Sequence, residues 1–129
     1  MILRDPEQLW SSYGIRSLSK KDLFYAEPNA PGDAPYWRGA IWIPINFLAL
    51  RACKFYADHP RVAQDLAELM AQTYSELRSN LMGLVLGEWE RTGSLWEHYD
   101  DATGHGMRSH PFTGWTALIL NIMSEKYSI

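Results

Sequence analysis

The longest unbroken apolar stretch of the chain predicts a buried helix. Residues 41–50 are apolar on almost every side, with Asn46 as the only polar member, and the helical pattern continues to about Asp58. Pro44 is tolerated only in the first turn of a helix, so we expect the helix to begin one or two residues before it. Because a helix that is apolar all round has no wet side, we expect both of its faces to be buried.

A second pattern predicts a longer helix with a single apolar face, from about Pro60 to Trp89. His59 and Pro60 form the break before it, and Gly83 and Gly87 are expected to bend or end its last turns. Charged residues occupy the remaining positions, as on an outer helix. The stripe has spacings of three and four and consists of Val62, Leu66, Leu69, Met70, Thr73, Leu77, Leu81 and Leu84.

Shorter patterns predict a helix near each end of the chain. Asp5 and Pro6 suit a helix start, so residues 7–13 are expected to form about two turns before Gly14 ends them. Near the other end, a stripe from Trp115 to Met123 predicts a final helix that is capped by Ser109 or Thr113 and ends near Glu125.

The rest of the pattern indicates loops. Residues 15–36 carry three prolines and a glycine, and the aromatic pair Phe24 and Tyr25 indicates a loop that docks on the body. A loop of this length is usually functional or disordered. With no internal repeat, the sequence predicts an all-α domain of helices joined by long aromatic loops.

Composition narrows the class of protein. A chain of 129 residues with 47% apolar and 21% charged residues forms one globular domain at most. The net charge of −3 and the lack of a basic stripe argue against a nucleic-acid partner. No stretch reaches the length of a membrane helix, and the N-terminus has no apolar run long enough for a signal peptide. The single Cys53 excludes an intrachain disulfide and is expected to be a buried, inert thiol.

The segment from residue 93 to residue 115 is the strongest candidate for chemistry. Glycines and a proline frame Glu97, which lies between Trp96 and Tyr99. Such a carboxylate can be partly desolvated while the aromatic rings face a sugar, and one carboxylate that activates water is the core of glycoside hydrolysis. The alternative is a polar loop attached to the body by aromatic packing.

Neighbouring residues of this segment suggest other roles. His98, His105 and His110 have spacings of seven and five residues, which match no common zinc pattern, so we expect no metal. Asp100 and Asp101 precede a glycine and are expected to form a turn through bonds to their own downstream backbone.

Three segments carry a resemblance to a known family. They are Ser12–Lys20, Tyr36–Asn46 with its Tyr-Trp-Arg-Gly run, and the Glu97 segment. They occur in the order of the family, and the resemblance extends over nearly the whole chain, residues 1–129. Together they resemble the C-terminal part of glycoside hydrolase family 63, whose eukaryotic members are processing α-glucosidases. Ala40 stands where the family usually has proline. The resemblance implies the last part of an (α/α)6 barrel, incomplete on its own.

The resemblance also implies an activity and a set of site residues. The family hydrolyses glycosides with inversion, needs no cofactor or metal, and removes the terminal α-1,2-linked glucose of the N-glycan precursor. Glu97 matches the general base. The resemblance implies contacts of an oligosaccharide substrate with Trp37, Arg38, Trp42, Tyr99, His110 and Phe112.

Several of these contacts have equally simple structural interpretations. Arg38 could instead tie the long loop down through carbonyl groups. For Trp42 core packing is the favoured interpretation, and Phe112 could also be a core residue. His110 could orient either a sugar hydroxyl or the Glu97 segment.

The family's general acid has no counterpart in this sequence. We therefore expect this chain alone to be inactive, and the missing N-terminal part of the barrel to be its partner. Full-length members of the family lie in the endoplasmic reticulum through an anchor that would lie upstream. Two rival interpretations remain: a non-catalytic carbohydrate-binding module, and a structural remnant that folds only with a partner chain.

Overall fold

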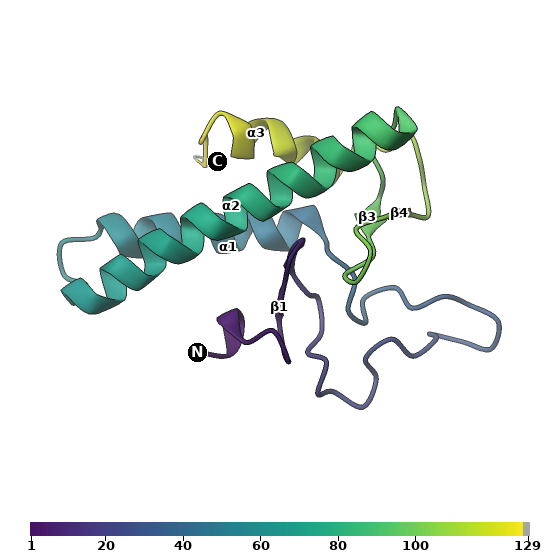
Figure 1. Ribbon diagram of the computed structural model, residues 1–129, viewed down its shortest axis with the longest axis horizontal. Helices are drawn as coiled ribbons and strands as arrows, with labels where there is room; N and C mark the ends of the chain where they lie inside the picture. The colour runs from purple at the N-terminus through teal and green to yellow at the C-terminus, as the bar shows by residue number, and fades with distance from the viewer. Residues whose placement is uncertain (128–129) are drawn as a thin grey trace.

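The computed structural model describes residues 1–127, and this part of the chain is mainly helical. Figure 1 shows the long helix α2 crossing the molecule, with α1 along one side of it and α3 along the other. The long loop and the β3–β4 hairpin lie beyond one end of α1, and the β1–β2 hairpin lies beside the two long helices. The elements are η1 (Ile2–Arg4), β1 (Trp10–Ser11), β2 (Gly14–Ile15), α1 (Ile43–Asp58), α2 (Gln64–Thr92), β3 (His98–Tyr99), β4 (Gly106–Met107), η2 (Trp115–Leu118) and α3 (Ile119–Met123).

The core forms where the apolar faces of the helices meet. α1 packs against α2, η2 packs against α1, and α3 packs against α2. Cys53 lies in α1, is buried as expected, and has a pKa raised by burial. No helix among the described residues is long and apolar enough to cross a membrane. The helical members of the core are Ile43, Phe47, Leu50, Leu77, Leu81, Leu84, Val85, Ile119 and Ile122.

The two long helices confirm the periodicity, with differences at their ends. α1 covers Ile43–Asp58 and carries its proline in the first turn, as predicted. α2 begins four residues later than expected, at Gln64, and continues past both of its glycines to Thr92. Gly93 then ends it in the left-handed conformation, at φ 74°, and its amide donates to the Trp89 carbonyl. The two glycines therefore do not end the helix early, and α2 ends three residues beyond the predicted Trp89.

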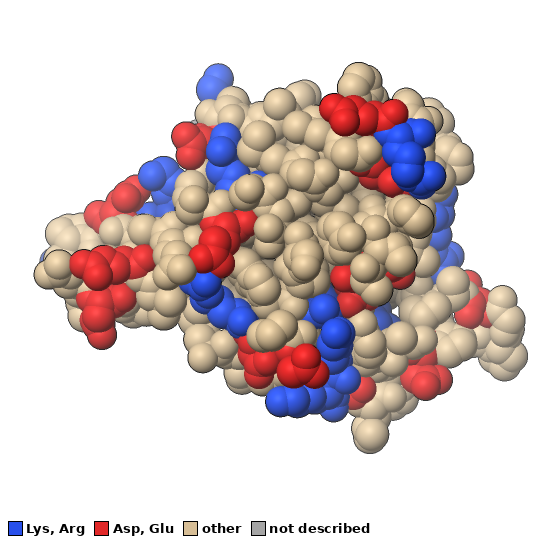
Figure 2. All heavy atoms as spheres, in the orientation of Figure 1, with Lys and Arg blue, Asp and Glu red and all other residues tan. Residues whose placement is uncertain are grey.

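The prediction that α1 is buried on both faces was also wrong for this chain. Ile45 is 42% exposed and Leu48 is 52% exposed, because no element of the described chain covers that side of the helix. Other large apolar side chains are exposed on α2 and α3, including Trp89 and Leu120. Figure 2 shows acidic and basic side chains interspersed on the face in view, with broad uncharged areas between them.

The predicted helix over residues 7–13 does not form. The Asp5 side chain accepts the Glu7 amide at 2.9 Å and supports a turn, after which β1 and β2 pair antiparallel with Trp10 opposite Ile15. The Asn46 side chain explains the preference for a hairpin. It accepts the Ile15 amide at 2.7 Å and donates to the Ile15 carbonyl at 3.0 Å, which holds β2 extended.

The final helix is shorter than predicted. The 3-10 helix η2 precedes α3, and α3 ends at Met123 rather than near Glu125. Neither Ser109 nor Thr113 caps it. The residue before η2 is Gly114, which has no side chain and so cannot form a capping bond.

A strip of backbone pairing joins the long loop to the second hairpin. β3 and β4 pair antiparallel, with Tyr99 opposite Gly106. The Ile41 amide donates to the Tyr99 carbonyl at 2.8 Å, and the Tyr99 amide donates to the Ile41 carbonyl at 3.0 Å. Ile41 also forms an antiparallel bridge with Arg16. The start of α1 is therefore fixed between the two hairpins.

Replacing Asn46 by alanine should lower the free energy of unfolding by about 2–4 kcal/mol, because it leaves the buried amide and carbonyl of Ile15 without partners. Urea unfolding measures this loss. The control Asn121→Ala removes an amide from a more accessible site and should cost less than about 0.5 kcal/mol. Equal stability of the two variants would contradict a structural role for Asn46.

Candidate active site

Glu97 lies directly before β3, in a backbone frame that leaves it little freedom. Its amide donates to the Ser109 carbonyl at 3.0 Å, and its carbonyl accepts the indole N–H of Trp115 at 2.8 Å. The residue is only 8% exposed. The main chain at Glu97 is therefore fixed on both sides, and the residue is largely shielded from water.

The side chain of Glu97 has one strong and one weak donor. The Tyr36 hydroxyl donates a short hydrogen bond to Oε1, and the Ser109 amide lies 3.4 Å from Oε2. The pKa of Glu97 is lowered, chiefly by the Tyr36 hydrogen bond, while burial opposes this effect. Glu97 is therefore ionised at neutral pH, and Oε2 keeps capacity to accept a proton from water.

Tyr36 is itself held by three neighbours. The Arg108 guanidinium lies 4.4 Å from the centre of its ring, and Arg108 also forms a 3.1 Å ion pair with Asp33 on the same loop. The ring edge contacts Trp42, with centroids 4.8 Å apart. The hydrogen bond to Glu97 raises the pKa of Tyr36, so the hydroxyl keeps the proton that it donates.

Three flat rings form a stack beside this pair. The Trp37 and Trp42 rings lie 3.7 Å apart at 9°, and the His98 ring lies 4.5 Å from Trp42 at 14°. Trp37 is the exposed end of the stack, at 45%, whereas Trp42 and His98 have no exposed surface. Within residues 1–127 neither ring nitrogen of His98 has a hydrogen-bond partner. Burial lowers the pKa of His98 to about 4, so the imidazole is neutral and behaves as an aromatic plate.

Two of the expected substrate contacts have no surface with which to contact a ligand in this structure. Trp42 forms the middle of the stack, and its indole N–H donates to the Tyr36 carbonyl at 3.2 Å. Tyr99 is completely buried, and its hydroxyl accepts the Trp96 amide at 3.3 Å. Both residues contact the Glu97 segment from the interior of the protein, Trp42 through the His98 ring and Tyr99 through the Trp96 amide.

Arg38 ties the long loop to itself. It donates to the Pro28 carbonyl at 2.7 Å and to the Glu27 carbonyl at 3.4 Å, and its guanidinium lies over the Phe24 ring. These are the carbonyl contacts expected from the sequence as the alternative to a sugar contact.

His110 and Phe112 lie on the segment that follows β4. The His110 ring covers Trp96 at 3.6 Å between centroids, and its Nδ1 lies 3.2 Å from the Arg108 carbonyl. Phe112 is half-buried against Trp115. Through these contacts both residues lie next to groups that border Glu97.

The two aspartates after β3 have different roles. Asp100 forms the expected turn, because its Oδ1 accepts the amides of Ala102 and Thr103. Asp101 does not. Its Oδ2 accepts Nε of Arg16 at 2.5 Å and the Tyr25 hydroxyl at 2.6 Å, so it joins segments far apart in the sequence.

A second buried carboxylate belongs to Glu88, near the end of α2. One of its oxygens accepts Nε of Arg91, and the other accepts both Nη2 of Arg91 and the Gly106 amide at 2.8 Å. The Arg91 bonds lower its pKa, so it is ionised and fully paired. Among the described residues no group of three His, Cys, Asp or Glu side chains could hold a metal ion.

Tyr36 and Arg108 are site residues that the sequence did not predict. Tyr36 is part of the Tyr-Trp-Arg-Gly run, but its bond to Glu97 spans 61 residues and no local pattern shows it. The signals in the sequence were the aromatic neighbours of Glu97 and the place of Tyr36 at the start of that run.

Comparison with known proteins assigns this chain to a protein family. The model of the glycosyl hydrolase family 63 C-terminal domain matches residues 1–125, so this chain belongs to glycosyl hydrolase family 63. It is similar to a probable mannosyl-oligosaccharide glucosidase of Schizosaccharomyces pombe, with 45% identity over 127 residues, 98% of this chain. It is also similar to alpha-glucosidase 2 of Arabidopsis thaliana, with 43% identity over 94% of the chain.

A more distant relative is the mannosyl-oligosaccharide glucosidase of Saccharomyces cerevisiae, with 38% identity over 96% of this chain. The chain spans only 14–15% of the length of these three curated relatives.

Replacing Tyr36 by phenylalanine should raise the pKa of Glu97 toward its ordinary value, because the main group that stabilises the charged form is removed. The Glu97 pKa is lowered in the folded state, so its stabilising contribution is present above the unfolded pKa and lost as pH falls through the folded one. The variant should therefore lose stability at pH 7 but not near pH 2.

Carbon-13 NMR titration of the glutamate side chains measures this pKa. Tyr56→Phe, which changes an exposed tyrosine of α1, is the matched control and should leave Glu97 unchanged. An unaltered Glu97 titration in Tyr36→Phe would show that this bond does not control its charge.

Proposed function

We propose that this chain supplies the general base of an inverting α-glucosidase, with Glu97 as the base. The observation that carries the proposal is the state of Glu97: ionised, shielded, oriented by Tyr36 through Oε1, and able to accept a proton through Oε2. In an inverting mechanism the base removes a proton from the water that attacks the anomeric carbon. The substrate class that family membership supports is an oligosaccharide ending in an α-1,2-linked glucose, as in the N-glycan precursor.

The exposed end of the ring stack suits the sugar. Trp37 presents an open ring braced from behind by Trp42, and an indole face packs well against the apolar face of a pyranose. His110 and Phe112 lie near enough to border the same site. We assign Arg38, Trp42 and Tyr99 a supporting role, because each is committed to protein contacts.

The second carboxylic acid that inversion needs comes, in this proposal, from another part of a longer polypeptide. Glu88 cannot serve, since both of its oxygens are paired with Arg91 or the Gly106 amide and its pKa is lowered. A base without an acid leaves the glycosidic oxygen unprotonated. The exposed apolar sides of α1 and α3 support a missing layer of helices around this piece. We also propose, from the resemblance to full-length members of the family, that the whole protein acts in the endoplasmic reticulum.

The test is complementation. The S. pombe relative, cut before the region that matches this chain, is co-expressed with this chain, and glucose release from an α-1,2-linked glucose disaccharide is measured. We expect release by the mixture and none by either part alone. Glu97→Gln should lower the rate by about 10²–10⁴-fold, the usual contribution of a general base.

The control for this loss is Glu90→Gln, which changes an exposed carboxylate of α2 and should keep full activity. Full activity of the Glu97→Gln mixture would show that Glu97 is not the general base. Saccharide binding by the chain alone, with no complementation, would instead favour the carbohydrate-binding module.

A further inference from the structure

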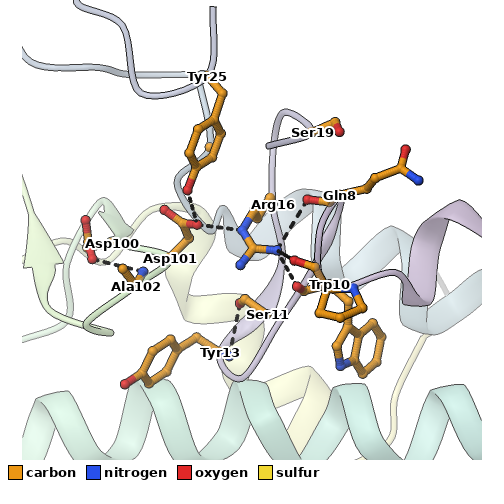
Figure 3. Close-up of polar contacts among 12 residues, drawn as sticks. Gln8, Trp10, Ser11, Tyr13, Arg16, Ser19, Tyr25, Asp100, Asp101 and Ala102 are labelled. Atoms are coloured by element: carbon orange, nitrogen blue, oxygen red, sulfur yellow. Dashed lines mark hydrogen bonds and ion pairs between the residues drawn. The ribbon is translucent and has the colours of Figure 1, made fainter. Parts of the chain in front are cut away.

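An ion pair behind the active site joins three distant segments. Arg16 is only 6% exposed and follows β2, whereas Asp101 follows β3. The Arg16 side chain is 5% exposed and the Asp101 side chain 11%, with Nε and Oδ2 2.5 Å apart. Figure 3 shows Arg16 at the centre of these contacts, with Asp101 and Tyr25 on one side and the N-terminal turn on the other.

Two nitrogens of Arg16 and one oxygen of Asp101 carry the hydrogen bonds of the pair. Nη1 of Arg16 lies within hydrogen-bond distance of the carbonyl groups of Pro6, Gln8 and Trp10. The Tyr25 hydroxyl donates to the same oxygen of Asp101 at 2.6 Å. Burial and the bond to Asp101 raise the pKa of Tyr25 to about 12, so the hydroxyl remains a donor. Buried charges persist only when they are paired in this way, so these residues are costly to change.

Two tyrosine–carboxylate bonds connect the same two segments. Tyr25 and Tyr36 both lie on the long loop, and their acceptors Asp101 and Glu97 both flank β3. The loop between the tyrosines is internally tied, because the Ala26 amide donates to the Arg38 carbonyl at 2.8 Å. The Tyr25 ring also lies directly against Gly39, where an added Cβ would be 2.6 Å from it. Forming one bond therefore holds the partners of the other at close range.

We propose that Arg16 and Asp101 are positioning residues for Glu97. Arg16 holds Asp101, Asp101 holds Tyr25, and the loop carried by Tyr25 brings the Tyr36 hydroxyl onto Oε1 of Glu97. The inference rests on the proposed function, because the orientation of Glu97 matters for turnover only if Glu97 is the base. Neither residue contacts the reacting atoms.

The test compares three variants of this chain by the Glu97 titration and by thermal unfolding. Tyr25→Phe removes one hydrogen bond and no charge, so we expect the pKa of Glu97 to rise. Asp101→Asn weakens both bonds and removes a negative charge. The charge effect alone would lower the Glu97 pKa, whereas loss of positioning raises it, so the direction separates the two causes.

The matched control is Tyr74→Phe. The Tyr74 hydroxyl donates to Glu125 at 2.7 Å, a bond of the same kind between α2 and the chain end. We expect this variant to lower the melting temperature by several degrees, about as much as Tyr25→Phe, while leaving the Glu97 pKa unchanged.

A Glu97 pKa that stays constant in Tyr25→Phe and is lowered or unchanged in Asp101→Asn, with the same thermal loss as the control, would overturn the proposal and leave the network with a structural role only. If Asp101→Asn does not fold, Tyr25→Phe decides alone. The titration needs no turnover. The result therefore stands even if Glu97→Gln proves active in complementation, which would overturn the proposed function instead.

Discussion

The buried backbone of Ile41 is the contact on which the rest of the site depends. It pairs with Tyr99 through two hydrogen bonds and bridges to Arg16, so three segments meet at one residue that has no exposed surface. The positions of the neighbouring site residues are fixed by their distance along the chain from this pair. Glu97 lies two residues before Tyr99, and Trp42 lies one residue after Ile41. The charge and orientation of Glu97 are then set by hydroxyl and indole donors that the strip brings within reach.

Local sequence patterns were sufficient for the parts of the fold that local forces determine. The apolar spacing of α1 and α2 predicts two helices, because each buries a continuous face against the other. The same logic failed over residues 7–13, where Asn46, 31 residues beyond Ile15, supplies hydrogen bonds that favour an extended strand. The prediction that α1 is buried on both faces was wrong for a related reason. An apolar residue shows that a surface could be buried, but it does not show that another element is present to cover it.

The sequence was sufficient to predict the central residue of the candidate site but not its hydrogen-bond partners. Glu97 stood out through its aromatic and glycine neighbours, and the structure places aromatic rings around it. Its strongest donor, Tyr36, could not be found, since a hydroxyl donor and its acceptor leave no periodic trace. Arg38 and Tyr99 show the opposite case. The family resemblance implies ligand contact for both, while in this structure their hydrogen bonds tie Arg38 to the long loop and Tyr99 to the core.

The most direct measurement of the role of Glu97 is chemical rescue in the complemented enzyme. Glu97→Ala is assayed with α-glucosyl fluoride, whose leaving group needs little protonation, in the presence of azide, a nucleophile that needs no base. We expect restored turnover and β-glucosyl azide as the product, because azide enters from the side of the sugar on which Glu97 acts. Absence of rescue, or formation of the α-azide, would contradict Glu97 as the base of an inverting reaction.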